Sequence, residues 1–245
     1  MGPATPEAAY DPIAQWYDDW VGGAANDSLD NDPYFPPLVE LVGEVAGLRI
    51  CDLACGQGRI ARALAKWGAQ VVGVDISGEL LAIAERYASA DAPVEYRHDS
   101  AHSLGSCQDA EFDGVIANMA MMDIPDLAAT VRSTFRVLRP GGWFAFSTFH
   151  PCFNTPRSAE LVDETGRWHR TVTGYFTEGH WTSDQRVGTA RTVGAYHRTL
   201  ATYLNTLIEA GFTLRQVREI PGVSAIWQQV PPVLAVIVDK PGIPS

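Results

Sequence analysis

The chain has 245 residues and a mass of 26.6 kDa, which is long for one domain and short for two. Hydrophobic residues make up 46% and charged residues 19%, so we expect a soluble domain with a sizeable insertion. The formal charge of −11 opposes a nucleic-acid partner and an anionic membrane surface, because both attract clusters of Lys and Arg.

The N-terminal residues are rich in Pro, Asp and aromatic side chains, and they predict two helices. Apolar residues at helical spacing predict the first helix over 10–20. Pro36 and Pro37 then interrupt the chain, and a second helix is expected over 38–45. We interpret residues 1–47 as a helical lid.

From residue 48, strands alternate with helices. The predicted strands are 50–53, 70–74, 94–97, 112–117, 143–148, 213–220 and 233–239. The predicted helices are 59–67, the segment from a Ser77 cap to residue 87, 126–138 and 196–210. This alternation indicates a parallel sheet with crossover helices, and it assigns 48–150 and 196–245 to one core.

The alternation stops after the fifth strand. Residues 151–195 have little apolar periodicity and many Thr and Gly, which predicts short antiparallel strands and loops in a substrate cap. Aromatic side chains in and beside this cap are candidates to stack a ring or hold a cation, or alternatively to form a small satellite core. They are Tyr175, Trp181, Tyr196 and His197.

A glycine-containing turn at 51–59 carries the clearest chemical signal. Gly56 and Gly58 let the backbone approach a ligand, and the following helix N-terminus supplies free N–H groups. The turn alone also fits a dinucleotide site, so a nicotinamide-dependent oxidoreductase is one alternative. Asp52 favours a ligand with an ammonium group over a pyrophosphate, and Asp75 is placed to accept hydrogen bonds from ribose hydroxyls.

Residues 52–58 resemble motif I of class I S-adenosylmethionine-dependent methyltransferases, in the form found in ubiquinone and menaquinone biosynthesis, with Ala54 replacing the first glycine. Further resemblances lie at the second motif, the adenine loop, the motif IV strand and the turn before the fifth strand. These segments are 72–77, 98–101, 112–118 and 138–142. The resemblance is close over 48–148 and loose over 196–239.

This resemblance implies a Rossmann-like α/β fold: a mostly parallel seven-stranded sheet, its last strand antiparallel, with helices on both faces and a small cap insertion. It implies S-adenosylmethionine as cofactor and S-adenosylhomocysteine as product, with no metal. The implied cofactor-binding residues are Tyr17, Asp52, Ala54, Cys55, Gly56, Gly58, Asp75, Ile76, Asp99, Ser100, Asn118 and Met119.

The family implies a separate role for each group. Asp52 and the 54–58 backbone hold the methionine part, and Asp75 holds the ribose. Adenine packs on Ile76, with its amino group bound by Asp99 beside Ser100. Asn118 and Met119 line the floor near the sulfonium. Tyr17, or alternatively Tyr10, closes over the cofactor; helix capping by the acids and helix packing by the tyrosine are the structural alternatives.

His150 follows the fifth strand at the carboxyl edge of the sheet, where open α/β folds bind ligands. It is a candidate general base, since imidazole titrates near physiological pH. Lining the substrate pocket and a structural role in the next turn are the alternatives. His98 and His102 are spaced for a metal only if helical, and we expect no metal site.

The predicted activity is methyl transfer to an N, O or C atom of a small molecule in secondary or cofactor metabolism. Methylation of a peptide N-terminal amine and a non-catalytic cofactor-binding role are further alternatives. We expect no nucleic-acid or membrane partner, and a monomer or homodimer. The absence of a cationic, apolar leader and the scattered spacing of the four cysteines predict a cytoplasmic protein with free thiols.

Overall fold

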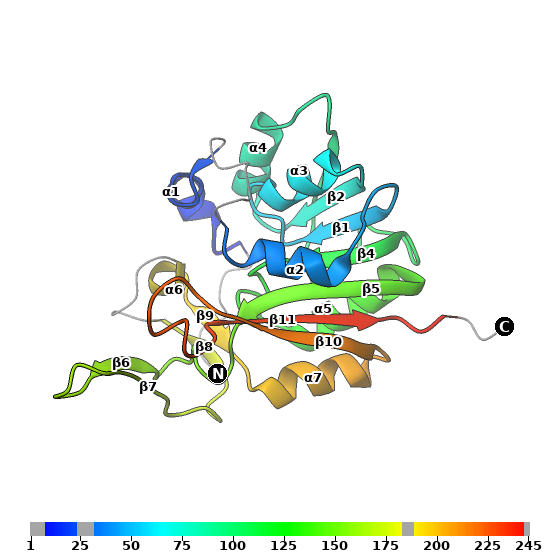
Figure 1. Cartoon of the computed structure of the whole chain (residues 1–245). Helices are drawn as coiled ribbons and strands as arrows, with labels where there is room; N and C mark the ends of the chain where they lie inside the picture. The colour runs from blue at the N-terminus through cyan, green and yellow to red at the C-terminus, as the bar shows by residue number, and fades with distance from the viewer. Residues whose placement is uncertain (1–7, 24–31, 183–188, 243–245) are drawn as a thin grey trace.

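A seven-stranded sheet forms the centre of the molecule (Figure 1). The computed structural model describes residues 8–23, 32–182 and 189–242. The sheet order is β10-β11-β5-β4-β1-β2-β3, and β11 is antiparallel to both of its neighbours. The strands are β1 Arg49–Leu53, β2 Gln70–Asp75, β3 Val94–His98, β4 Phe112–Ala117, β5 Leu138–Phe149, β10 Thr213–Ile220 and β11 Val233–Asp239. The predicted Rossmann-like sheet is confirmed.

Helices cover both faces of this sheet, and the central strands are buried on both faces. The helices are η1 Asp11–Ile13, α1 Ala14–Trp20, α2 Phe35–Val42, α3 Arg59–Lys66, α4 Gly78–Arg86, α5 Leu127–Val137 and α7 Leu200–Glu209. Trp143 and Ala145 of β5 pack with α2 and α3, whereas Phe144 and Phe146 pack with α5 and α7. This alternation follows from the two-residue period of a strand. Helix α1 lies against α4.

Helix α2 begins earlier than the sequence predicts. The prolines expected to precede it occupy its first turn, where a missing N–H breaks no helical hydrogen bond. The Asp32 carboxylate accepts from the backbone N–H groups of Tyr34 and Phe35, which fixes this start. Helix α2 packs on the sheet, with Phe35 and Leu38 fully buried.

Two further boundaries differ from prediction. Helix α7 begins at Leu200, where the Thr199 side chain accepts from the Thr202 N–H, so the expected start at residue 196 was wrong. Strand β5 begins at Leu138 because that residue already pairs with Phe112. The sequence pattern did not reveal this pairing, which crosses a register shift.

Short antiparallel strands form the cap, as predicted. They are β6 Ala159–Val162, β7 Trp168–Thr171, β8 Gly179–Trp181 and β9 Ala195–His197, with α6 Thr189–Thr192 between the last two. Strand β6 pairs with β7 and β8 with β9, and the β6–β7 hairpin extends from the body (Figure 1). Within the described ranges, no helix combines the length and apolar character needed to cross a membrane.

Candidate active site

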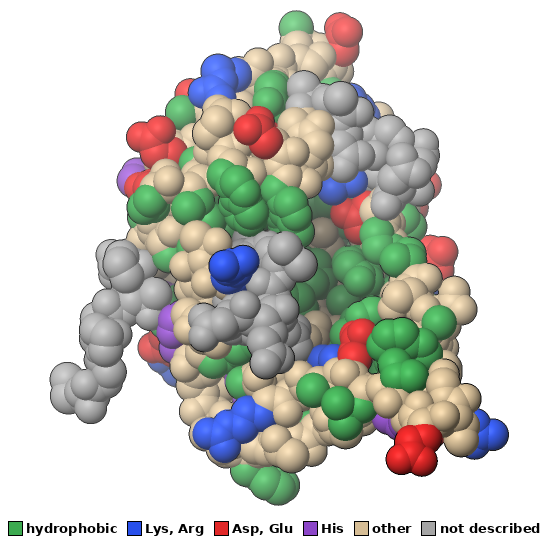
Figure 2. All heavy atoms as spheres, turned by 90° about the vertical axis from the view of Figure 1, so that its left-hand side faces the viewer, with side chains coloured by type: hydrophobic (Ala, Val, Ile, Leu, Met, Phe, Trp, Pro, Cys, Tyr) green, Lys and Arg blue, Asp and Glu red, His purple; other side chains and the backbone are tan. Residues whose placement is uncertain are grey.

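Two adjoining cavities open at the carboxyl edge of β1, β2 and β4. The face seen in Figure 2 is hollowed near its centre, with hydrophobic side chains in the hollow. The empty space of the two cavities, solvent at their mouths included, is about 1070 and 1320 Å³. Their boundary is formed by the residues that line both: Tyr10, Tyr17, Ala54, Gly56, Asn118, Met119 and Asp123.

Two residues at this boundary have strained backbone, Ala54 in the turn after β1 and Met119 in the loop after β4. Ala54 and Met119 have φ angles of +55° and +51°, a left-handed conformation that costs a residue with a side chain roughly 1–2 kcal/mol. A Cβ on Gly56 would meet no atom nearer than Tyr17 Cε1 at 3.8 Å, so this glycine borders open space. Such strain concentrates at functional sites.

Gly58 has a different reason to be glycine. Its φ is +78°, and an added Cβ would lie 2.3 Å from the hydroxyl oxygen of Tyr96. It lines neither cavity. The structure therefore places Gly58 at a packing contact under the turn, apart from the other residues predicted to bind the cofactor.

Asp52 is a buried carboxylate with spare hydrogen-bonding capacity. Its side chain borders the second cavity, is 1% exposed, and has one oxygen without a hydrogen-bond partner. Burial raises the pKa of Asp52 to about 8. The negative charge of Asp75 also raises this pKa, and a hydrogen bond from the Ala61 backbone N–H lowers it. An ammonium group would satisfy the free oxygen and restore the charged form. Cys55, also predicted at the site, lines the same cavity and is buried.

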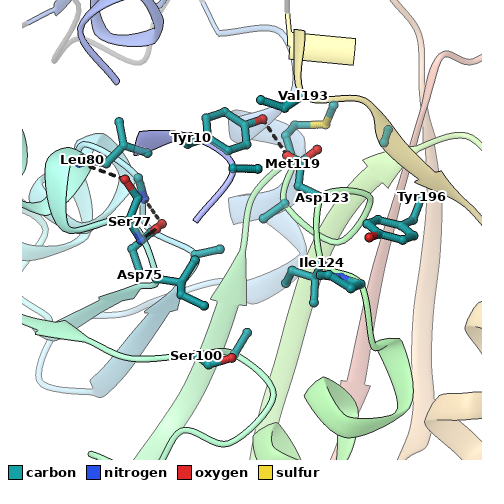
Figure 3. Close-up of a pocket in the computed structure, with 18 of the residues that line it drawn as sticks. Tyr10, Asp75, Ser77, Leu80, Ser100, Met119, Asp123, Ile124, Val193 and Tyr196 are labelled. Atoms are coloured by element: carbon teal, nitrogen blue, oxygen red, sulfur yellow. Dashed lines mark hydrogen bonds between the residues drawn. The ribbon is translucent and has the colours of Figure 1, made fainter. Parts of the chain in front are cut away.

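Asp75 joins the turn to the next helix. Its two oxygens accept from the Gly56 N–H at 2.7 Å and the Ser77 N–H at 2.8 Å. Burial raises its pKa, and these hydrogen bonds partly offset that effect. Ser77 also caps α4, as predicted, by accepting from the Leu80 N–H. Figure 3 shows Asp75, Ser77 and Leu80 along one side of the first cavity, whose lining includes Ile76.

The far wall of the first cavity comes from the loop after β3. Asp99 and Ser100 line it, together with His102. Burial opposes ionisation of Asp99, but hydrogen bonds from Ser106 and Ser100 outweigh it and lower its pKa. These bonds turn both carboxylate oxygens toward the protein's own backbone, at 2.7 Å from Ser100 N and 2.6 Å from Ser106 N. Its predicted contact with adenine stays a prediction.

The floor between the cavities is held rigidly. Asn118 Oδ1 accepts from the Ser147 hydroxyl at 2.9 Å, and that hydroxyl oxygen accepts from the Met119 N–H at 2.8 Å. Ser147 is fully buried on β5. Both residues predicted to line the floor therefore lie where the cavities meet.

Two tyrosines cover the boundary from the N-terminal side. Tyr10 and Tyr17 pack edge to face with ring centroids 5.3 Å apart. Burial raises the pKa of Tyr17, as do the nearby charges of Asp123 and Asp75. The Tyr10 hydroxyl donates to Asp123 Oδ2 at 3.0 Å, as the dashed line in Figure 3 marks.

Sequence reasoning missed Asp123, although a signal was present. This acid follows β4 by six residues and lies on the same edge of the sheet as Asp52 and Asp75. Burial raises its pKa to about 7, with the Asp75 charge adding to the effect and the Tyr10 hydrogen bond opposing it.

The cap contributes only part of its predicted aromatic set. Tyr196 lines the first cavity beside His180, with ring centroids 5.0 Å apart, but Tyr175, Trp181 and His197 line neither cavity. The Tyr175 hydroxyl accepts from the Leu200 N–H at 2.9 Å, and its carbonyl lies 2.7 Å from the His197 ring nitrogen. This contact pattern matches the satellite-core alternative.

His150 lines neither cavity. Its ring is buried, with Nε2 3.0 Å from a Glu219 carboxylate oxygen and Nδ1 accepting from the Cys152 N–H at 3.1 Å. Burial lowers its pKa, and Glu219 opposes that change. The geometry thus favours the structural alternative. Across the described residues, no group of three or more His, Cys, Asp or Glu is placed to hold a metal ion.

Comparison with known proteins gives matches over this core. A family model described as a methyltransferase domain matches residues 51–146. Ubiquinone biosynthesis O-methyltransferase of Leptothrix cholodnii is 35% identical over 115 residues, 46% of this chain and 49% of that protein. The Methylococcus capsulatus enzyme of the same name is 38% identical over 120 residues, 49% and 51% of the two chains. The chain thus spans about half the length of these curated relatives.

A solved structure extends the likeness to whole chains. The S-adenosylmethionine dependent methyltransferase of Mesorhizobium loti is 30% identical, with a TM-score of 0.75 over 87% of this chain and 100% of its own. The chain belongs to the class I S-adenosylmethionine-dependent methyltransferase family. A putative S-adenosylmethionine dependent methyltransferase of Listeria monocytogenes is 28% identical, with a TM-score of 0.72 over 85% of this chain and 98% of its own.

Family membership gives the cavities a chemical context. S-adenosylmethionine carries an ammonium group, a ribose and an adenine, and the turn of this methyltransferase offers a free buried carboxylate oxygen beside open space at Gly56. The residues present therefore fit the family's cofactor.

Proposed function

We propose that the protein transfers a methyl group from S-adenosylmethionine to a small-molecule acceptor. The observation that carries this proposal is the unpartnered, buried oxygen of Asp52 beside a cavity that continues past Asn118 and Asp123. In this proposal Asp52 holds the ammonium group, Asp75 the ribose, and Ile76 the adenine. When bound, S-adenosylmethionine supplies an electrophilic methyl group on a good leaving group.

The chain's own contribution is position and exclusion of water. The rigid Asn118–Ser147 floor and the Tyr10–Tyr17 cover support this role. Holding an acceptor in line with the methyl group can contribute about 7–11 kcal/mol to lowering the barrier. Because no base is needed once the acceptor has a free lone pair, the remote position of His150 is compatible with the reaction.

Several observations favour a small acceptor. The relatives matched over the core are named for ubiquinone biosynthesis, which supports a role in cofactor or secondary metabolism. The charge of −11 disfavours nucleic acid. A peptide amine remains the second candidate, because the acidic lining described below suits a cationic group. Free thiols support a cytoplasmic location, and we propose a monomer or homodimer.

Binding of S-adenosylhomocysteine tests the cofactor assignment. A ligand that binds only the native state stabilises it by about 2.7 kcal/mol at a hundredfold excess over Kd, so the melting temperature should rise. NAD⁺ should give no shift, since the free oxygen of Asp52 suits an ammonium group and offers no cation to a pyrophosphate. A shift with NAD⁺ and none with millimolar S-adenosylhomocysteine would favour the oxidoreductase alternative.

A further inference from the structure

We infer that Asp123 is the residue that selects the acceptor, binding a primary or secondary amine and taking its proton. The inference rests on the proposed function and deepens it. Asp123 lies in the loop that follows β4. Like Asn118 and Met119, it lines both cavities.

The Asp123 side chain is fixed at this point. Its Oδ2 accepts from the Tyr10 hydroxyl at 3.0 Å, which leaves Oδ1 for another donor (Figure 3). The loop beneath it is held by Arg198, whose guanidinium donates to the carbonyls of Met121, Ile124 and Pro125. The Tyr196 N–H donates to the Met122 carbonyl at 2.6 Å. Residues just after the cap thus hold the backbone of the loop that carries Asp123.

The charge around the cavities favours a cation. Among the described residues that line the first cavity, there is no Lys or Arg, while Asp75, Asp99 and Asp123 all contribute. The second cavity includes one arginine in its described lining, Arg59, and this forms an ion pair with Asp32 at 3.1 Å. An anionic acceptor would therefore face carboxylates with little compensation.

Aromatic rings complete a surface suited to an organic ammonium. Ring faces attract cations, and acids beside them add Coulomb attraction. The aromatic residues lining one or both cavities are Tyr10, Tyr17, Trp20, Tyr34, Phe149 and Tyr196. A phenol would have to become an anion to react well, and this lining offers that anion less stabilisation than it offers an ammonium.

The acceptor ammonium gives one N–H proton to the Asp123 carboxylate, which frees the nitrogen lone pair. That lone pair forms the new N–C bond as the C–S bond breaks, and the electron pair of the broken bond stays on sulfur. A carboxyl with a pKa of about 7 is well matched to this proton exchange near neutral pH.

Sinefungin tests the inference without an identified acceptor. In this analogue an amine-bearing carbon replaces the sulfonium, so an ammonium group lies where the transferred methyl group would be. Calorimetric titration would compare sinefungin with S-adenosylhomocysteine for the wild type, Asp123→Asn and Asp126→Asn. Asp126 is a matched control because it is an exposed acid of the same loop, lines neither cavity, and caps α5, where Asn is an equally good cap.

The wild type and Asp126→Asn should bind sinefungin more tightly than S-adenosylhomocysteine. Asp123→Asn should lose this preference by about tenfold while keeping its affinity for S-adenosylhomocysteine. Its melting temperature should not fall, because Asn still accepts from Tyr10 and removes a partly buried charge.

An unchanged sinefungin preference in Asp123→Asn, with S-adenosylhomocysteine still bound, would overturn this inference and leave the proposed function standing. Failure of the wild type to bind S-adenosylhomocysteine would overturn both. A lower melting temperature with an unchanged preference would assign Asp123 a structural role and likewise overturn the inference.

Discussion

At the scale of single residues, Asp75 accepts from two backbone N–H groups and is proposed to hold the ribose, and one substitution tests both roles. Asp75→Ala removes the predicted acceptor for ribose hydroxyls, and charge-assisted bonds of this kind contribute about 1.5–3 kcal/mol. Affinity for S-adenosylhomocysteine should therefore fall at least about tenfold in a calorimetric titration. The variant should also be less stable, because the N–H groups of Gly56 and Ser77 lose their acceptor. Unchanged affinity would show that the ribose lies elsewhere.

His150 should behave as a structural residue. His150→Ala removes the contact with Glu219 and leaves the Cys152 N–H without its acceptor, so stability should fall by about 1–3 kcal/mol in chemical denaturation. Affinity for S-adenosylhomocysteine should be unchanged. A general base would behave differently, with kcat lowered by about 10²–10⁴-fold, normal KM and a flattened pH profile. That outcome would contradict the placement of His150 away from the cavities.

At the scale of elements, Arg198, which lies between β9 and α7, connects the end of the cap to the loop that carries Asp123. Arg198 is buried and donates to three loop carbonyls while lying near the rings of Tyr196 and Tyr203. Arg198→Met should lower the free energy of unfolding by at least about 3 kcal/mol, because each of the three orphaned carbonyls costs about 1–3 kcal/mol. It should also speed proteolysis within 151–195. Arg198→Lys should restore little of this stability, because a lysine ammonium cannot donate to the three carbonyls with the planar geometry of a guanidinium. Full rescue by Lys would contradict this account.

Sequence patterns predicted the elements that depend on local signals and missed the contacts between residues that are far apart in the chain. Local signals sufficed for the existence of the seven sheet strands, though not for the start of β5, and for the Ser77 cap and the turn at Gly56, because each depends on neighbours within a few residues. The Tyr10–Asp123 hydrogen bond joins residues 113 apart, so no local pattern contained it. His180 likewise reaches the first cavity only because β8 pairs with β9. Pro36 was misread because proline is compatible with both a break and a first helical turn.

At the scale of the whole molecule, buried acids should make the free protein less stable as pH rises. Asp52 and Asp123 keep their protons in the native state up to pKa values of about 8 and 7, whereas the unfolded chain releases them near pH 4. The native state therefore binds more protons than the unfolded chain from about pH 4 to about pH 8, so the free energy of unfolding should fall across that range and still be falling between about pH 6.5 and 8.

Asp75, whose pKa burial also raises, acts in the same direction, and the groups with lowered pKa values act outside this window. Glu111, with a pKa of about 2, gives constant stability above pH 4.5, and the lowered pKa of His150 acts below about pH 6.5. Urea denaturation across the window should show the decline in the wild type and a shallower slope in Asp52→Asn. Equal slopes in the two proteins would contradict the assigned protonation of Asp52.

A crystal structure with S-adenosylhomocysteine bound would test the cofactor assignment most directly. We expect the ligand's ammonium within hydrogen-bonding distance of the Asp52 oxygen that otherwise has no partner. The ribose should lie on Asp75 and the adenine beside Ile76 in the first cavity. A ligand whose ammonium pairs elsewhere, or whose adenine lies in the second cavity, would contradict the account.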